Sequence, residues 1–563
     1  MLDLSGELAP TLWWEWARPH VLLLIAYLLA TWMTEPHFMA DTVGYADAAV
    51  SGDSTRMWEF GHLLWRPLGR MGAAVFAPLL RLWVGTDARA GVLLVLVTTS
   101  WLAGLISVLS LAGLLRRVCR REWVMLVASI AFIFAHGFLN FAQAGTPYVP
   151  GLAFLMLGLY LLSKGGESPR RSWLVAFLAG AALAFAVGMW FLYIWALPAA
   201  IVMPLFLFGV NRQRVRLVLQ TTLFCSLFGA LIFGTGMGIL GIHTFEGFHA
   251  WVLKASHGAT SSGFARMVFG FARSFINMGN DGVLFKRFML HDPYNPVSLA
   301  EIFRLSLWKL GLFYVFLAAI AVNLVRSKNG RRVFGLLMLS ALPLLGFAVL
   351  WQGGDIERYL PLYPFVFLAF AYSLESENAI ALLKGAALLF VAAAAVTSVA
   401  VMAKPVLHRQ EEAVMSRLEE LRLGLKAQST VITVHQQDEL WKANYSFPFN
   451  PFFRQYANLV YPAAALGTVQ TIRWREDFAS HALSVWRAGG DVWLSKRLLQ
   501  PRPRAEWNWV EGFAPMSWSE LHSFFSQMET GKAVGDEDGF VLLVDSQGNE
   551  QILRPLASRK ETK

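Results

Sequence analysis

The sequence predicts a polytopic α-helical membrane protein that ends in a soluble α/β domain. Hydrophobic residues occupy 56% of the 563 positions, and charged residues occupy only 15%. A soluble protein usually has about 25% charged residues. The apolar residues are concentrated in long runs that stop near residue 402, and the chain beyond has an ordinary soluble composition. We therefore expect a transmembrane domain over residues 1–402 and a soluble domain over residues 403–563.

The apolar runs predict about 11 transmembrane helices. A helix needs roughly 20 apolar residues to cross a bilayer. The run 172–208 is too long for one crossing and is interpreted as a helical hairpin. The region 68–85 contains Arg70 and Arg81 and is predicted to be a re-entrant or interfacial helix. The expected spans are 19–35, 90–115, 122–140, 148–163, 172–189, 191–208, 217–240, 306–325, 333–351, 358–374 and 379–402.

Basic residues in the short connections indicate the orientation. Four connections are rich in Lys and Arg, and all four lie on one side if the N-terminus is cytoplasmic, which the positive-inside rule favours. The loops 36–89 and 241–305 and the C-terminal domain then face outward. The net charge of +10 is thus interpreted as a topology signal, and no nucleic-acid partner is expected. With only Cys119 and Cys225, no disulfide framework is available, which fits a bacterial inner membrane with a periplasmic C-terminal domain.

The C-terminal domain shows alternating helix and strand signals. A charged helix is expected over 409–426, and buried strands are expected over 429–435, 491–495 and 539–545. Amphipathic helical stretches lie between these strands. A small α/β domain is therefore expected, without a catalytic signature of its own.

The first outward loop opens with acidic residues close to the membrane boundary. Asp41, Asp47 and Asp53 follow the first span directly. A partly desolvated carboxylate there would suit proton removal from a hydroxyl, or it would bind a divalent cation through oxygen. The alternative is a solvated acidic loop. Farther along the loop, His62 and Arg66 would share a helix face, where Arg66 binds a lipid phosphate or reaches the headgroups as a structural cation.

Two further outward clusters carry charge. The second loop contains Lys254 and His257 among several basic residues, which favours an anion-binding surface, with a plain solvated loop as the alternative. A metal site at the start of this loop is disfavoured, because no His-Glu-x-x-His pattern is present. The third cluster holds Asp355, Glu357 and Arg358 at the outer end of the tenth span. Charged groups at such a position are functional candidates, and an ordinary charged loop is the alternative.

Two short motifs resemble those of the GT-C glycosyltransferases. The segment Asp41-Thr-Val-Gly-Tyr-Ala46 is similar to the acidic opening of the first outward loop in that superfamily. The segment Glu357-Arg-Tyr-Leu-Pro361 is similar to an Arg-Tyr-Leu-x-Pro signature that begins a late span. Two departures occur: Thr42 stands where a second acid is common, and Pro361 follows Leu360 directly.

The resemblance implies transfer of a sugar from a polyprenyl-phosphate donor, with inversion, to a lipid, glycan or protein acceptor at the outer face. Asp41 would be the general base, with Asp47 as the alternative, and Arg66, Lys254 or Arg358 would stabilise the departing phosphate. The remaining substrate contacts implied are Tyr45, His62, His257, Glu357 and Tyr359. No cofactor is certain, and a divalent cation bound through Asp41 stays open. A secondary transporter or flippase, or an O-antigen ligase type of enzyme, are the alternative functions.

Overall fold

The structure is a computed structural model that describes residues 13–561, apart from 40, 166–171, 256–262, 280–281, 377–380, 423–424, 427, 436–437, 451–459, 465–472 and 515. The chain divides into two units. The first contains residues Met1–Asn277 and Lys309–Ala403, and the second contains Met278–Trp308 and Lys404–Lys563. The second unit thus includes a piece of the second outward loop in addition to the C-terminal domain.

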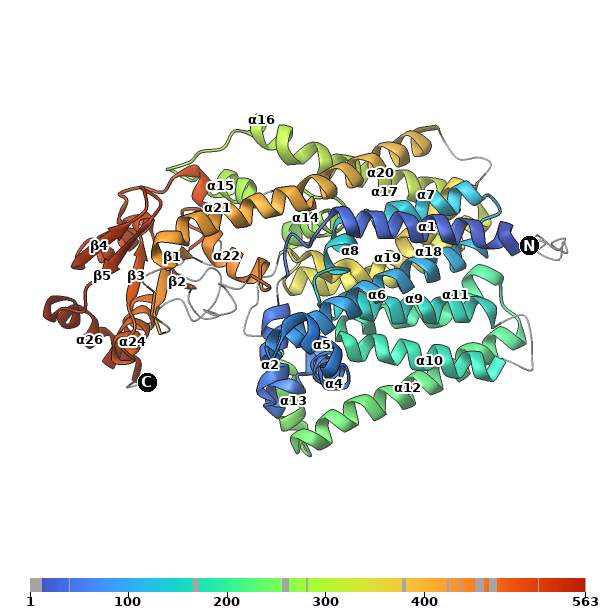
Figure 1. The fold of residues 1–563 in the computed structure, drawn as a ribbon. Helices are drawn as coiled ribbons and strands as arrows, with labels where there is room; N and C mark the ends of the chain where they lie inside the picture. The colour runs from blue at the N-terminus through green and yellow to red at the C-terminus, as the bar shows by residue number, and fades with distance from the viewer. Residues whose placement is uncertain are drawn as a thin grey trace. The chain divides into compact units, whose positions relative to one another are not determined.

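The first unit is all helical (Figure 1). Its long helices alternate with short ones that lie in the connections. They are α1 (Trp13–Met33), α2 (Thr42–Ser51), α3 (Ser54–Met57), η1 (Phe60–His62), α4 (Trp65–Val75), α5 (Ala77–Val84), α6 (Ala88–Arg116), α7 (Glu122–Ile133), α8 (His136–Phe141), α9 (Tyr148–Lys164), α10 (Ser172–Met189), η3 (Phe191–Ala196), α11 (Leu197–Phe208), α12 (Arg212–Leu240), α13 (Phe245–Lys254), α14 (Phe264–Phe275), α17 (Trp308–Val325), α18 (Lys328–Leu350), η6 (Ile356–Leu362), α19 (Tyr363–Glu375) and α20 (Ala381–Met402).

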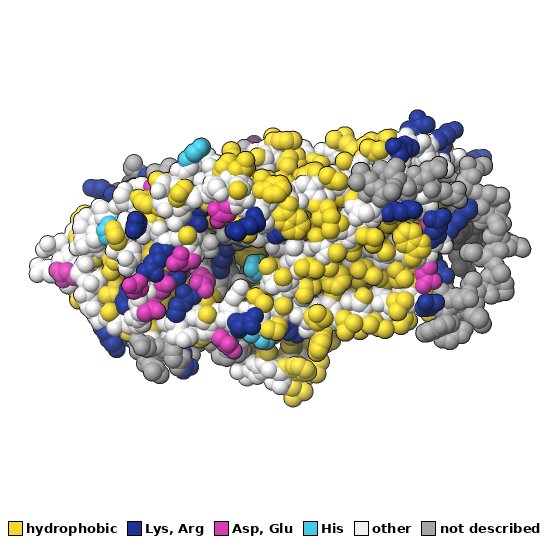
Figure 2. Space-filling model, turned by 90° about the horizontal axis from the view of Figure 1, so that it is seen from above, with side chains coloured by type: hydrophobic (Ala, Val, Ile, Leu, Met, Phe, Trp, Pro, Cys, Tyr) yellow, Lys and Arg dark blue, Asp and Glu magenta, His cyan; other side chains and the backbone are white. Residues whose placement is uncertain are grey.

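Helix surfaces in this unit are apolar in the way that lipid contact requires. Along α12, Leu219, Leu223, Leu227 and Leu231 are each at least 56% exposed and recur every four residues, which places them on one face of the helix. Figure 2 shows hydrophobic side chains gathered over the helices of this unit, with charged side chains gathered elsewhere. An apolar face that stays exposed is stable in a bilayer, so the unit is a polytopic membrane domain, as predicted.

Seven helical stretches among the described residues are long and apolar enough to cross a membrane. Each of the other four expected spans contains a shorter apolar helix. The expected span 122–140 is interrupted between α7 and α8, because the extended backbone of Ala135 separates the two helices. The expected span 358–374 begins as the 3₁₀ helix η6, which contains Pro361 and is followed by α19 with Pro364 at its start. The region 68–85, predicted to be a re-entrant or interfacial helix, forms parts of two short helices, α4 and α5.

The second unit contains the predicted α/β domain. Its five-stranded sheet has the order β2-β1-β3-β5-β4, in which β1 pairs in parallel with β2 and β3, and β5 pairs antiparallel with β3 and β4. The three predicted strands are confirmed as β1, β3 and β5. The strands are β1 (Thr430–His435), β2 (Val460–Ala464), β3 (Val492–Ser495), β4 (Thr530–Val534) and β5 (Phe540–Leu543). The helices are α15 (Val283–Leu290), α16 (Leu299–Ile302), η5 (Phe303–Leu307), α21 (Lys404–Arg422), α22 (Glu439–Ser446), α24 (Trp474–Arg487), η8 (Lys496–Leu499), η9 (Ala505–Trp507), α25 (Trp518–Phe525) and α26 (Gln547–Glu561).

Residues 278–308 belong to the second unit because of buried polar contacts. The Arg287 guanidinium donates to the backbone oxygen of Ala505 at 2.6 Å and to that of Trp509 at 3.2 Å. The Asp292 carboxylate lies 3.6 Å from Arg287, and both side chains are buried. A buried charge without partners would be costly, so these contacts fix the segment against the sheet domain.

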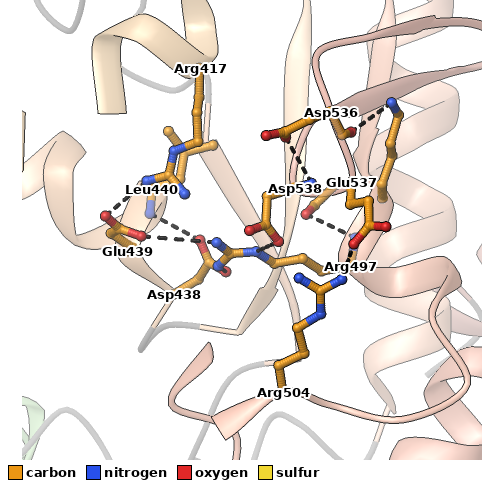
Figure 3. Close-up of polar contacts among 11 residues, drawn as sticks. Arg417, Asp438, Glu439, Leu440, Arg497, Arg504, Asp536, Glu537 and Asp538 are labelled. Carbon is orange, nitrogen blue, oxygen red and sulfur yellow. Dashed lines mark hydrogen bonds and ion pairs between the residues drawn. The ribbon is translucent and has the colours of Figure 1, made fainter. Parts of the chain in front are cut away.

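Ion pairs join the carboxyl ends of β1 and β3 to the turn between β4 and β5 (Figure 3). Buried Arg497 lies 3.2 Å from Asp438 and 3.2 Å from Asp538. The Asp438 side chain also accepts a hydrogen bond from Leu440 N at 2.9 Å and so caps α22. Every charge in this cluster is thereby matched within the domain, which indicates a structural role.

Candidate active site

Asp41 lies directly before the first turn of α2. The Thr42 hydroxyl donates to the backbone oxygen of Met39 at 2.6 Å and also contacts that of Ala144, which anchors the start of α2 near the start of α9. The Asp41 side chain makes no capping hydrogen bond to α2, and the residue is exposed. The local sequence therefore fixes the backbone at Asp41 but leaves its carboxylate available for other contacts.

Two tyrosine hydroxyls hold that carboxylate. Tyr148, the first residue of α9, donates to Asp41 Oδ2 at 3.0 Å, and Tyr45 of α2 donates to the same oxygen at 3.3 Å. Both tyrosines are buried, at 4% and 2% exposure. Burial raises the pKa of Tyr45 well above its usual value, and the charge of Asp41 raises it further. Tyr45 therefore stays protonated and acts as a donor.

His62 and Arg66 lie on the other side of Tyr45. His62 Nε2 is 3.3 Å from the Tyr45 hydroxyl, and its ring packs edge-on against the Tyr45 ring at 5.1 Å. The Arg66 guanidinium lies 5.2 Å above the Tyr45 ring, but its polar contacts go to the Glu59 carboxylate and the backbone oxygen of Arg56. His62 thus joins the Asp41 group, whereas Arg66 is buried and neutralised by Glu59.

The third predicted cluster lies near Asp41. Burial is the main cause that raises the pKa of both Asp355 and Glu357, and the negative charge of Asp41 raises each of them further. Burial is the largest cause for Glu357 and raises its pKa to about 8, while the charge of Arg358 lowers it. Segments more than 300 residues apart in the sequence are therefore brought to one site. Helix η6, which contains Glu357, packs against α9. Tyr148, the first residue of α9, contacts Asp41, so α9 connects the two segments.

Arg358 is held by its own segment. Its guanidinium lies 3.9 Å from the centre of the Trp351 ring, contacts the side-chain oxygen of Gln352, and is 3.4 Å from Asp355 Oδ2. Tyr359 points elsewhere: its hydroxyl donates to the backbone oxygens of Gly353 at 2.5 Å and Met267 at 3.1 Å. The buried Tyr359 side chain therefore fixes the backbone of the 351–355 segment.

A second cation stands beside this segment. Arg273 of α14 donates to the backbone oxygen of Gly354 at 3.4 Å, and its charge lowers the pKa of Asp355. Asp355 belongs to the third cluster predicted from sequence, whereas Arg273 and Tyr148 were not singled out. Arg273 was visible only as one of several basic residues in the second loop, and Tyr148 had no signal beyond its position at the start of a span.

The remaining predicted residues lie elsewhere or outside the described part of the chain. Asp47 forms an ion pair with Arg89 at 2.7 Å. Lys254 is the exposed last residue of α13. His257 falls within 256–262, outside the described residues. In the described ranges, no group of three His, Cys, Asp or Glu side chains is arranged to hold a metal ion.

No protein-family model matches the chain, and no curated protein matches it. Among solved structures, the chain is similar to the oligosaccharyltransferase AglB from Archaeoglobus fulgidus in complex with an inhibitory peptide and a dolichol-phosphate. This match has 12% identity, covers 95% of this chain and 75% of that one, and has a TM-score of 0.45. ArnT from Cupriavidus metallidurans bound to undecaprenyl phosphate matches with 11% identity, 95% and 99% coverage and a TM-score of 0.43. At this distance the similarity assigns neither activity nor substrate.

Proposed function

We propose that this chain is a membrane glycosyltransferase that uses a polyprenyl-phosphate sugar at its outer face. The observation that carries the proposal is that Asp41 and helix η6 both contact α9, Asp41 through the Tyr148 hydroxyl and η6 by packing. A single displacement at an anomeric carbon needs a base for the acceptor hydroxyl and positive charge for the departing phosphate. Asp41 would supply the base, and Arg358 and Arg273 would supply the charge for a lipid-linked donor that presents its phosphate at the ends of these apolar helices.

Asp41 is the group suited to be the base. The acceptor oxygen would form a bond to the anomeric carbon while the bond from that carbon to the phosphate oxygen breaks. The electron pair leaves with the lipid phosphate, and the acceptor proton goes to the Asp41 carboxylate. Because a phosphate leaving group needs no proton, no second carboxyl acid is required, unlike in glycoside hydrolysis. Inversion follows from one displacement.

Arg358, supported by Arg273, is the best candidate for the phosphate contact. Arg66 is already neutralised by Glu59, and Lys254 is exposed at the end of α13. In contrast, the Arg358 guanidinium is stacked on Trp351 and lies 3.4 Å from Asp355 Oδ2, a longer separation than that between Arg66 and Glu59. An incoming phosphate would compete with Asp355 for this guanidinium.

The test is transfer from labelled polyprenyl-phosphate sugars by the purified full chain with membrane acceptors. Asp41→Asn should abolish release of polyprenyl phosphate, because an amide cannot accept the proton. Asp47→Asn tests the alternative general base, and retained activity in that variant supports Asp41 as the base. Asp53→Asn is the matched control, since Asp53 only caps α3 and Asn caps a helix equally well. Normal transfer by Asp41→Asn, or no turnover of any such donor by the wild type, would contradict the proposal.

A further inference from the structure

Oxygen Oδ2 of Asp41 receives both tyrosine hydrogen bonds. The donors come from different elements, α9 and α2, and they lie 3.0 and 3.3 Å away. Among the residues that the structure describes, Oδ1 receives no hydrogen bond. The two oxygens of one carboxylate are therefore in different states: one is held by the protein, and the other is open to an approaching group.

Tyr148 is the more firmly placed of the two donors. Its ring packs against Trp190 at 4.6 Å and edge-on against Phe141 at 5.1 Å. The Tyr193 hydroxyl donates to the Tyr148 backbone oxygen at 2.6 Å, which fixes the start of α9. By contrast, the Tyr45 hydroxyl has two polar partners, Asp41 Oδ2 and His62 Nε2, and each is 3.3 Å away, farther than the 3.0 Å between Tyr148 and Asp41.

We propose that Tyr148 is a positioning residue that, with Tyr45, holds Oδ2 of Asp41 so that Oδ1 is the oxygen that accepts the proton. This inference rests on the proposed glycosyl transfer and identifies which atom performs its proton step. In that step the acceptor O–H bond breaks, its proton bonds to Oδ1, and the electron pair of the sugar–phosphate bond leaves with the phosphate. The tyrosine protons stay on their own oxygens.

The two hydrogen bonds from Tyr148 and Tyr45 to Asp41 Oδ2 form a clamp, which has two measurable consequences. First, a carboxylate without it rotates away from the productive direction, which lowers kcat and leaves KM nearly unchanged because no substrate contact is lost. Second, a carboxylate oxygen that loses a hydrogen bond has a freer lone pair and reacts faster with a chemical reagent. The nearby charged groups His62, Arg66, Asp355 and Glu357 are retained in a Tyr148→Phe chain.

The experiment compares three Tyr-to-Phe variants of the full chain. Tyr148→Phe should lower kcat about 10- to 100-fold, less than the loss of the base itself, and Tyr45→Phe should have a smaller effect in the same direction. Tyr27→Phe is the matched control, because Tyr27 is also buried and its hydroxyl donates at 2.7 Å to the backbone oxygen of Trp101 and not to Asp41. Its kcat should equal that of the wild type.

A second measurement does not depend on transfer. Carbodiimide modifies carboxyl groups, and mass spectrometry reads the rate at which Asp41 is modified at one fixed pH. In Tyr148→Phe, and less in Tyr45→Phe, modification of Asp41 should be faster than in the wild type and in Tyr27→Phe. An unchanged rate in both variants overturns the clamp, as does a Tyr148→Phe kcat equal to that of the control. If the wild type transfers no sugar, the proposed function fails, and the labelling rate still decides whether the clamp exists.

Discussion

Replacing Gly270 by alanine tests whether the 351–355 segment positions reacting groups. Gly270 lies in α14, where the helix meets this segment. A Cβ atom at Gly270 would lie 2.0 Å from the backbone oxygen of Gly353 and 3.0 Å from Cα of Gly354. The obstacle is backbone, and Tyr359 holds the same oxygen with a 2.5 Å hydrogen bond. The segment that carries Asp355 must therefore move as a whole.

The size of the effect follows from that distance. Cβ atoms essentially never approach another heavy atom within 3.0 Å, so helix and segment must separate by roughly 1 Å. A misplacement of about 1 Å at catalytic groups can lower the rate by about 100-fold. The substitution also stabilises helix α14 itself, because alanine favours a helix over glycine by about 1 kcal/mol, and this gain offsets part of the destabilisation caused by the collision. We therefore expect a fall in transfer of roughly 100-fold without general unfolding.

The assay is polyprenyl-phosphate release by Gly270→Ala beside Gly346→Ala. Gly346 lies in α18, and a Cβ there meets nothing within 4 Å, so the control has the same chemical change without the collision. Thermal unfolding in detergent verifies that both variants are folded. Wild-type kinetics in folded Gly270→Ala would refute the idea that the distance between α14 and the 351–355 segment matters for catalysis.

Two further predictions concern charge. Arg497→Leu leaves the Asp438 carboxylate buried without its cation, so it should destabilise the sheet domain by about 3–5 kcal/mol, measured by hydrogen exchange of β1 and β3 in the full chain. Arg554→Leu, which breaks an exposed pair with Glu550, should have almost no effect, and equal effects would contradict the reasoning. For Glu357, a folded-state pKa of about 8 above the ordinary 4.5 means that ionisation opposes folding. The wild type should therefore lose thermal stability relative to Glu357→Gln from about pH 5 to about pH 9, and parallel curves would count against the raised pKa.

The helices of the membrane domain could be predicted from sequence because length and apolarity decide them. Where the prediction failed, a local feature interrupted the helix. The extended backbone at Ala135 breaks the run 122–140, and apolarity alone contains no signal for it. In the sheet domain, the central strands β1 and β3 are fully buried and were predicted. Strands β2 and β4 were missed, since β2 contains Pro462 and β4 is a mostly exposed edge strand with Gly531.

The charged residues of the site were found in part because charge is scarce in this chain. Asp41 and Glu357 stood out at the ends of apolar runs, and in the structure both lie on elements that contact α9, Asp41 through Tyr148 and Glu357 through η6. Arg66 and Asp47 stood out equally, but each has a nearby partner, Glu59 or Arg89. A sequence shows which charges exist, but pairing depends on distances that only the fold provides. Whether Asp41 and Glu357 act in catalysis stays a prediction.

Tyr148 shows most clearly why the rest of the site was not predictable. Asp41 is on a connection between helices, whereas Tyr148 begins a long helix packed among Trp190, Phe141 and Tyr193. In the proposed mechanism a loop supplies the reactive group and a rigid span supplies its orientation, which is a common division of roles in enzymes. The two residues are 107 positions apart, and nothing near Asp41 in the sequence indicates its partner. Substitutions of Trp190 or Phe141, which pack against the Tyr148 ring, should therefore affect Asp41 through the Tyr148 hydroxyl.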